Sequence, residues 1–103
     1  LACDLRIAVP NAQFFYPVMR IGYRPQRSDP GRLAALVGPA RARMILLAGQ
    51  RIGAEEALAW GLIDRIVALE ALMETAKTLA ADALAADHPH VAGLKRITRG
   101  ERP

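Results

Sequence analysis

Apolar and polar residues alternate near the start of the chain. Apolar residues recur at every second position from Asp4 to Val9, and Pro10-Asn11 follows as a turn. This period is typical of a strand with one buried face. A second short strand is predicted over Gln13 to Tyr16, and Pro17 ends it because proline lacks a backbone N–H. No regular period follows over residues 18–27, where we expect loop and irregular structure.

Two helices are predicted next. Asp29 is expected as the N-cap of the first helix, with Pro30 at its first helical position. This helix is expected to end at Gly38, and Pro39 opens the next helix, which runs through Ala48.

Two glycines divide the central part of the chain. Gly49 and Gly61 stand where helices commonly end in a left-handed residue, a conformation that glycine adopts at low cost. Between them, Ala54 to Trp60 is expected to form a helix of two turns. Branched residues after Gly61 predict a strand that ends at Val67.

The last third of the chain is predicted to be helical. Apolar residues at intervals of three and four form one stripe: Leu69, Leu72, Ala76, Leu79 and Ala83. Asp87-His88-Pro89 is expected to break this helix, and Val91 to Arg99 to form a last one. Because His88 and His90 stand two residues apart in a turn, without the set of ligands that a metal site needs, the pattern favours a solvated loop and predicts no metal site.

Composition excludes several classes of protein. The chain has 103 residues, of which 52% are hydrophobic, so disorder is not expected. No apolar stretch is long enough to span a bilayer, and the formal charge of +4 is scattered along the chain. We therefore predict neither a membrane nor a nucleic-acid partner. The single cysteine, Cys3, is expected to be a small buried side chain in a reducing compartment.

The residues of these elements resemble a known family in their order and spacing. Leu1-Ala-Cys3-Asp4-Leu-Arg6-Ile-Ala8 is similar to a strand of the enoyl-CoA hydratase/isomerase (crotonase) family, and the run from Met44 to Val67 is similar to its Gly, Ala-x-x-Ala and Gly-Leu-Ile pattern. Further matches in order are Asn11-Ala12-Gln13-Phe14, Pro17, Ile21-Gly22, Pro25, Arg32-Leu33 and Leu36-Val37-Gly38. The resemblance covers about Leu1 to Gly100.

The resemblance implies an α/β fold, a fragment of the ClpP/crotonase spiral. Residues 1–38 would hold the last core strands and the active-site loop, and residues 39–103 a C-terminal helical oligomerisation part. We expect the chain to be the back part of a longer protein, since it starts with Leu1 in a strand-like segment. A homotrimer or a dimer of trimers, a cytoplasmic location and a role in fatty acid metabolism are expected from the family.

Members of this family act on acyl-CoA thioesters, and no cofactor is expected beyond the coenzyme A of the substrate. Two backbone N–H groups hold the thioester oxygen as it gains enolate charge. By the resemblance both would lie before Leu1, so this fragment alone is expected to be inactive. Lys95, in the densest basic group, is expected either to contact the phosphates of coenzyme A or to favour a helix C-terminus.

The sequence departs from the family at the site. The stretch resembling Phe-x-x-Pro-Glu ends in Val18, which cannot exchange a proton, so the second catalytic Glu is missing. In the loop resembling Pro-Gly-x-Gly-Gly-x-x-Arg-Leu, three glycines are replaced, by Gln26, Ser28 and Asp29. We predict substrate contacts at Val18, Tyr23, Gln26 and Arg27. Tyr23, Arg24 and Arg27 either meet an acyl carboxylate or lie on the surface.

Two residues remain as candidates for the lost proton-transfer group. Asp29 is either an N-cap or a replacement carboxylate, and Tyr16 is either a proton donor or an ordinary packing residue. The sequence thus indicates a lyase or isomerase that stabilises a thioester enolate with an atypical active site. Isomerisation, dehydration, and thioester or carbon–carbon cleavage are the reactions considered. The alternative is a non-catalytic, degenerate protein that binds acyl-CoA or serves oligomerisation.

Overall fold

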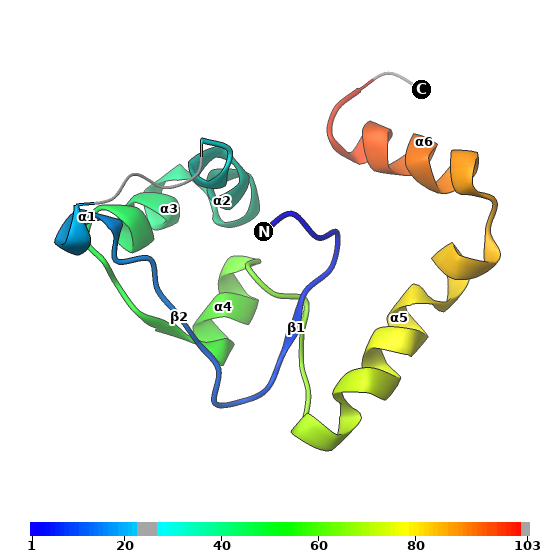
Figure 1. Cartoon of the computed structure of the whole chain (residues 1–103), viewed down its shortest axis with the longest axis horizontal. Helices are drawn as coiled ribbons and strands as arrows, with labels where there is room; N and C mark the ends of the chain where they lie inside the picture. Colours follow the sequence, from blue (N-terminus) through cyan, green and yellow to red (C-terminus); the bar gives the residue numbers. More distant parts are fainter. Residues whose placement is uncertain (23–26, 102–103) are drawn as a thin grey trace. The chain divides into compact units, whose positions relative to one another are not determined.

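The computed structural model describes residues 1–22 and 27–101. They form two compact units, Leu1–Leu72 and Met73–Pro103 (Figure 1). This boundary differs from the one expected between Gly38 and Pro39, because strands from the two sides of that point pair with each other. Each unit is described by itself.

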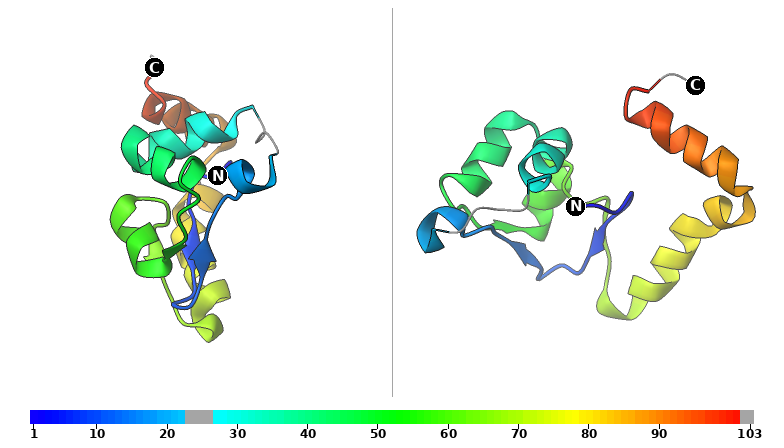
Figure 2. Two further views of the ribbon diagram at one scale, coloured as in Figure 1. Left: turned by 90° about the vertical axis from the view of Figure 1, so that its left-hand side faces the viewer. Right: turned by 45° about the horizontal axis from the view of Figure 1, so that its top comes forward.

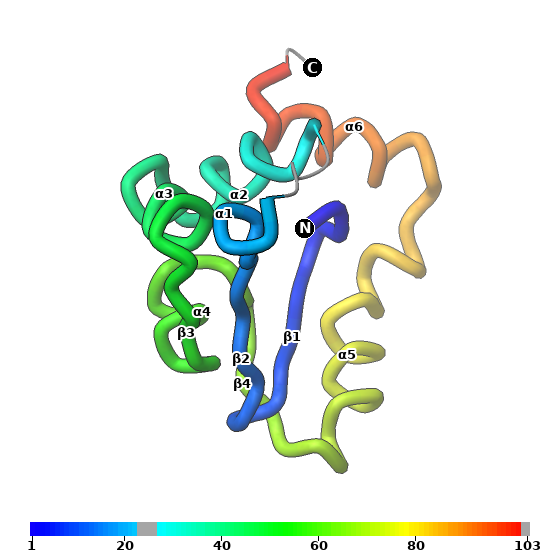
Figure 3. Tube along the Cα trace, turned by 60° about the vertical axis from the view of Figure 1, so that its left-hand side comes forward, coloured from blue at the N-terminus to red at the C-terminus, as the bar shows by residue number. Residues whose placement is uncertain are grey.

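Four strands of two residues each form two small sheets in the first unit (Figure 3). β1 (Ile7–Ala8) pairs in parallel with β4 (Arg65–Ile66), whereas β2 (Gln13–Phe14) pairs antiparallel with β3 (Ile52–Gly53). The register is Ile7 with Arg65, Ala8 with Ile66, Gln13 with Gly53 and Phe14 with Ile52. The predicted strands at β1, β2 and β4 are confirmed. β3 was not predicted, because the sequence around Ile52, between Gly49 and Gly53, shows no alternation of apolar and polar residues.

Helices link and cover these strands. The helices of the first unit are α1 (Val18–Ile21), α2 (Asp29–Val37), α3 (Pro39–Leu46), α4 (Ala54–Trp60) and the 3-10 turn η1 (Leu69–Ala71). α4 packs against β2, β3 and β4, and α2 packs against α3, as both views of Figure 2 show. The predicted helix end at Gly61 is confirmed, because Gly61 is the C-cap of α4 with φ 85°. Gly49 has the expected positive φ, 64°, but α3 ends earlier than Ala48, at Leu46 with Leu47 as its C-cap.

Two local predictions were wrong. Residues Val18–Ile21 form a helical turn instead of irregular chain, and Gly22 ends the turn at φ 74° by donating its N–H to the Val18 carbonyl, at 3.0 Å. The N-cap of α2 is Ser28, while Asp29 is the first helical residue and Pro30 the second. The Asp29 carboxylate accepts a hydrogen bond from the Tyr16 hydroxyl, and this contact takes the place of the expected cap.

The core of the first unit is apolar. Its buried members come from β1, α2, α3, β3, α4 and the segment after Gly61: Ala8, Leu33, Val37, Ala42, Ile45, Ile52, Ala54, Ala57, Leu62 and Ile63. Ala57 is completely buried, because α4 faces three strands at once. Gly61 lies so close to α2 that a Cβ at this position would stand 2.9 Å from the Leu36 carbonyl oxygen.

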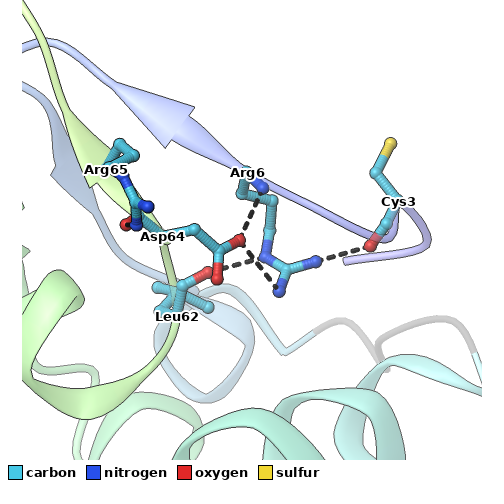
Figure 4. Close-up of polar contacts among 5 residues, drawn as sticks. All are labelled: Cys3, Arg6, Leu62, Asp64 and Arg65. Carbon is cyan, nitrogen blue, oxygen red and sulfur yellow. Dashed lines mark hydrogen bonds and ion pairs between the residues drawn. The ribbon is translucent and has the colours of Figure 1, made fainter. Parts of the chain in front are cut away.

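Arg6 joins β1 to the chain before β4 (Figure 4). Its backbone N–H donates to Asp64 Oδ2 at 2.8 Å, and its Nε donates to the Leu62 carbonyl at 2.6 Å. Nη1 of Arg6 also donates to the Cys3 carbonyl. The expectation of a buried Cys3 was wrong: the residue is exposed in a bend, because pairing with β4 begins only at Ile7.

The second unit is helical. It contains most of α5 (Leu72–Ala85) and all of α6 (His88–Thr98). Asp87 is the N-cap of α6 and accepts a hydrogen bond from the His90 N–H at 3.3 Å. The two histidines therefore lie in the first turn of a helix, and the solvated loop expected there was wrong. Within residues 1–22 and 27–101, no helix has the length and apolar character needed to cross a membrane.

Candidate functional site

A pocket of about 550 Å³ opens in the first unit. Most of its lining is apolar, and the polar side chains among the lining residues are Arg6, Gln13, Tyr16 and Asp29. Its full lining is Leu1, Arg6, Ile7, Gln13, Phe14, Phe15, Tyr16, Asp29, Leu33, Ile45, Leu62 and Ile63. A mainly apolar pocket with a few polar groups is the usual composition of a small-molecule site.

The Tyr16 hydroxyl donates a hydrogen bond to Asp29 Oδ2 at 2.8 Å in this pocket. Tyr16 comes two residues after the end of β2, and Asp29 begins α2. Both residues are half-buried. The structure thus brings together the two side chains that the sequence offered as separate candidates for proton transfer.

Arg6 brings a positive charge to the same pocket. Its side chain is held by two carbonyls and lies 3.9 Å from Asp64 Oδ2, so the guanidinium has a fixed position. Arg6 and Gln13 were not predicted as lining residues. A charged residue inside a predicted apolar strand was the signal for Arg6, whereas nothing in the pattern distinguishes Gln13.

Of the predicted substrate-binding residues, the structure describes Val18 and Arg27. Val18 is buried, with 7% of its surface exposed, and is not among the residues that line the pocket. Arg27 is exposed in the turn before α2. Tyr23, Arg24 and Gln26 lie outside the described residues. The assignment of these side chains to the substrate therefore stays a prediction.

Lys95 lies on α6 in the second unit. It is exposed and lines a shallow pocket of about 250 Å³ together with His88, Arg96 and Arg99. Cations on one helix face suit a phosphate, so the prediction for Lys95 stays open. In the described part of the chain, no three His, Cys, Asp or Glu side chains are grouped to hold a metal ion.

A further pocket of about 380 Å³ lies beside β2 and the end of α3. The Arg51 guanidinium stands 4.0 Å from the centre of the Phe15 ring there, and Arg20 lies on the same rim. Because cations above aromatic rings are a common way to hold a surface arginine, this contact by itself indicates packing.

Comparisons with known proteins match the whole described chain. A family model described as enoyl-CoA hydratase/isomerase matches residues 1–101. Carnitinyl-CoA dehydratase of Citrobacter koseri is 37% identical over 99 residues, which cover 96% of this chain and 38% of that protein.

Solved structures agree in fold. Pseudomonas aeruginosa DspI has a TM-score of 0.86 at 31% identity, covering 96% of this chain and 38% of that one. Enoyl-CoA hydratase from Mycobacterium tuberculosis H37Rv has a TM-score of 0.82 at 32% identity. The match covers 94% of this chain and 44% of that one. The chain thus spans about 38% of the length of the curated relative it matches.

Proposed function

Because the chain belongs to the enoyl-CoA hydratase/isomerase family, we propose that it is the C-terminal part of an acyl-CoA-handling enzyme, a lyase or isomerase that stabilises a thioester enolate. The apolar pocket with its few polar groups supports this proposal, since an acyl chain needs an apolar surface and its reaction needs a proton-transfer group. The substrate brings coenzyme A, and no other cofactor is proposed. Assembly as a homotrimer or dimer of trimers and a cytoplasmic location belong to the same proposal.

The choice of mechanism depends on the identity of residue 18. Valine has no proton to give or take, and its side chain is buried. This favours chemistry through one acid–base group over a mechanism that uses two carboxylates. Isomerisation of a double bond, or elimination from a 3-hydroxyacyl thioester, fits one such group. The dehydratase name of the Citrobacter koseri relative supports elimination.

The same observation also favours a second candidate, a degenerate family member that binds acyl-CoA or partners without catalysis. The residues upstream in the full-length parent discriminate the two. A Glu or Asp there that faces the acyl pocket would weaken the non-catalytic candidate, whereas loss of both carboxylates would support it.

The experiment uses the full-length parent and its Val18→Glu variant. We expect the parent to bind acyl-CoA and to turn over an enoyl- or 3-hydroxyacyl-CoA, and we expect the variant to gain hydratase activity because it restores a second carboxylate. Val37→Glu is the matched control, because Val37 is as buried as Val18 but belongs to the core cluster. Val37→Glu should destabilise the protein and should not gain hydratase activity.

The outcomes separate the parts of the proposal. If Val18→Glu still binds acyl-CoA but gains no hydratase activity, position 18 is not the position of the second catalytic Glu. A parent that neither binds nor converts any acyl-CoA would overturn the function itself. We also expect no turnover by the 103-residue chain alone, and measurable turnover would contradict this.

A further inference from the structure

Tyr16 and Asp29 meet in the pocket although twelve residues separate them. The 2.8 Å bond runs from the phenolic O–H to a carboxylate oxygen, which makes it a charge-assisted hydrogen bond. The end of β2 and the first turn of α2 hold the two partners. The carboxylate gained at position 29 therefore meets Tyr16, which stands two positions before the lost Glu at position 18 in the sequence.

We propose that Tyr16 and Asp29 act together as the proton-transfer group of the enzyme, in place of a carboxylate at position 18. This inference rests on the proposed function. Tyr16 is the catalytic residue, since it lines the pocket and carries an exchangeable proton. Asp29 is a positioning residue that accepts the proton through the tyrosine.

The surroundings suit this role. Both side chains are half-buried, and the wall beside them is apolar, with Phe14, Leu33 and Ile63 among the lining residues. A hydrogen bond to a charged group is stronger in such surroundings than in water. The cation of the pocket, Arg6, is bound to carbonyls and to Asp64, so it is not recruited to neutralise Asp29.

The proton balance closes without another reactant. In elimination from a 3-hydroxyacyl thioester, the Tyr16 oxygen takes the C2 proton while its own proton passes to Asp29. The C2–H electrons pass through the enolate into the C2–C3 double bond, and the C3–O bond breaks. The proton on Asp29 then returns to Tyr16, which gives its proton to the leaving hydroxide. Water departs, and the pair ends in its starting state.

The test compares Asp29→Asn and Tyr16→Phe in the full-length parent with a 3-hydroxyacyl-CoA. Asparagine keeps an oxygen that accepts from the Tyr16 hydroxyl, so it preserves the tether between β2 and α2 but cannot take a proton. We expect each variant to lower kcat by about 100-fold or more with little change in KM. Asp87→Asn is the control, because Asp87 is a carboxylate at the start of another helix, the N-cap of α6, and it should leave kcat unchanged.

A purely structural bond gives a different result. In that case Tyr16→Phe lowers the thermal midpoint, and Asp29→Asn keeps normal kcat and the wild-type pH profile; this outcome would overturn the proposal. If Tyr16→Phe does not fold, the kcat of Asp29→Asn by itself decides whether the pair transfers a proton. If the full-length parent neither binds nor converts acyl-CoA, the proposed function is refuted. The proton-transfer role of Tyr16 and Asp29 is then refuted as well.

Discussion

Replacing Gly61 by alanine tests how tightly α4 and α2 are fitted together. Gly61 has φ 85°, and this left-handed conformation costs a residue with a Cβ about 1–2 kcal/mol. The new methyl would also stand 2.9 Å from the Leu36 carbonyl oxygen, so the backbone of α2 has to shift. Such overpacking typically costs about 1–3 kcal/mol. Together the two effects predict a loss of about 2–5 kcal/mol in the free energy of unfolding.

Gly49→Ala is the matched control. Gly49 also has a positive φ, 64°, but a Cβ there meets nothing within 4 Å. It should therefore show the backbone strain alone, about 1–2 kcal/mol. Thermal and urea unfolding of the chain, followed by circular dichroism, measure both variants. The midpoint of Gly61→Ala should fall by roughly 10–20 °C, clearly more than that of the control. Equal losses in the two variants would refute the role of the contact with Leu36.

The remaining predictions concern one bond in each unit. Asp64→Ala removes the acceptor of the Arg6 N–H and should cost about 1–2 kcal/mol, with faster amide exchange in β1; Glu101→Ala, at an exposed ion pair, should cost less than about 0.5 kcal/mol. Equal exchange in these two variants would argue against the role of Asp64. Asp87→Ala removes the N-cap of α6 and should cost about 1 kcal/mol and lower the helical circular dichroism signal. Asp82→Ala, inside α5, should not lower the helical signal. A similar loss of signal in this variant would contradict the role of Asp87 as the N-cap of α6.

The sequence alone determined most of the longer helices and the family. Gly61 marks the end of α4 because the left-handed conformation is nearly specific to glycine, and Gly61 is the left-handed C-cap of that helix in the structure. The period of three and four after Leu69 likewise identified α5, since it is a property of a helix whatever its surroundings. Local rules sufficed for these elements, and the order of the anchor residues sufficed for the family.

The strand pairing and the site needed the tertiary structure. β3 is two residues long, and only its contact with Gln13 and Phe14 makes it a strand. Asp29 looked like an N-cap because the local pattern contains no information about Tyr16, which lies thirteen positions earlier in the sequence. A side chain with two possible partners takes the one that the fold brings within hydrogen-bond distance. For this reason the sequence supplied both candidates for proton transfer, and only the tertiary structure made them a pair.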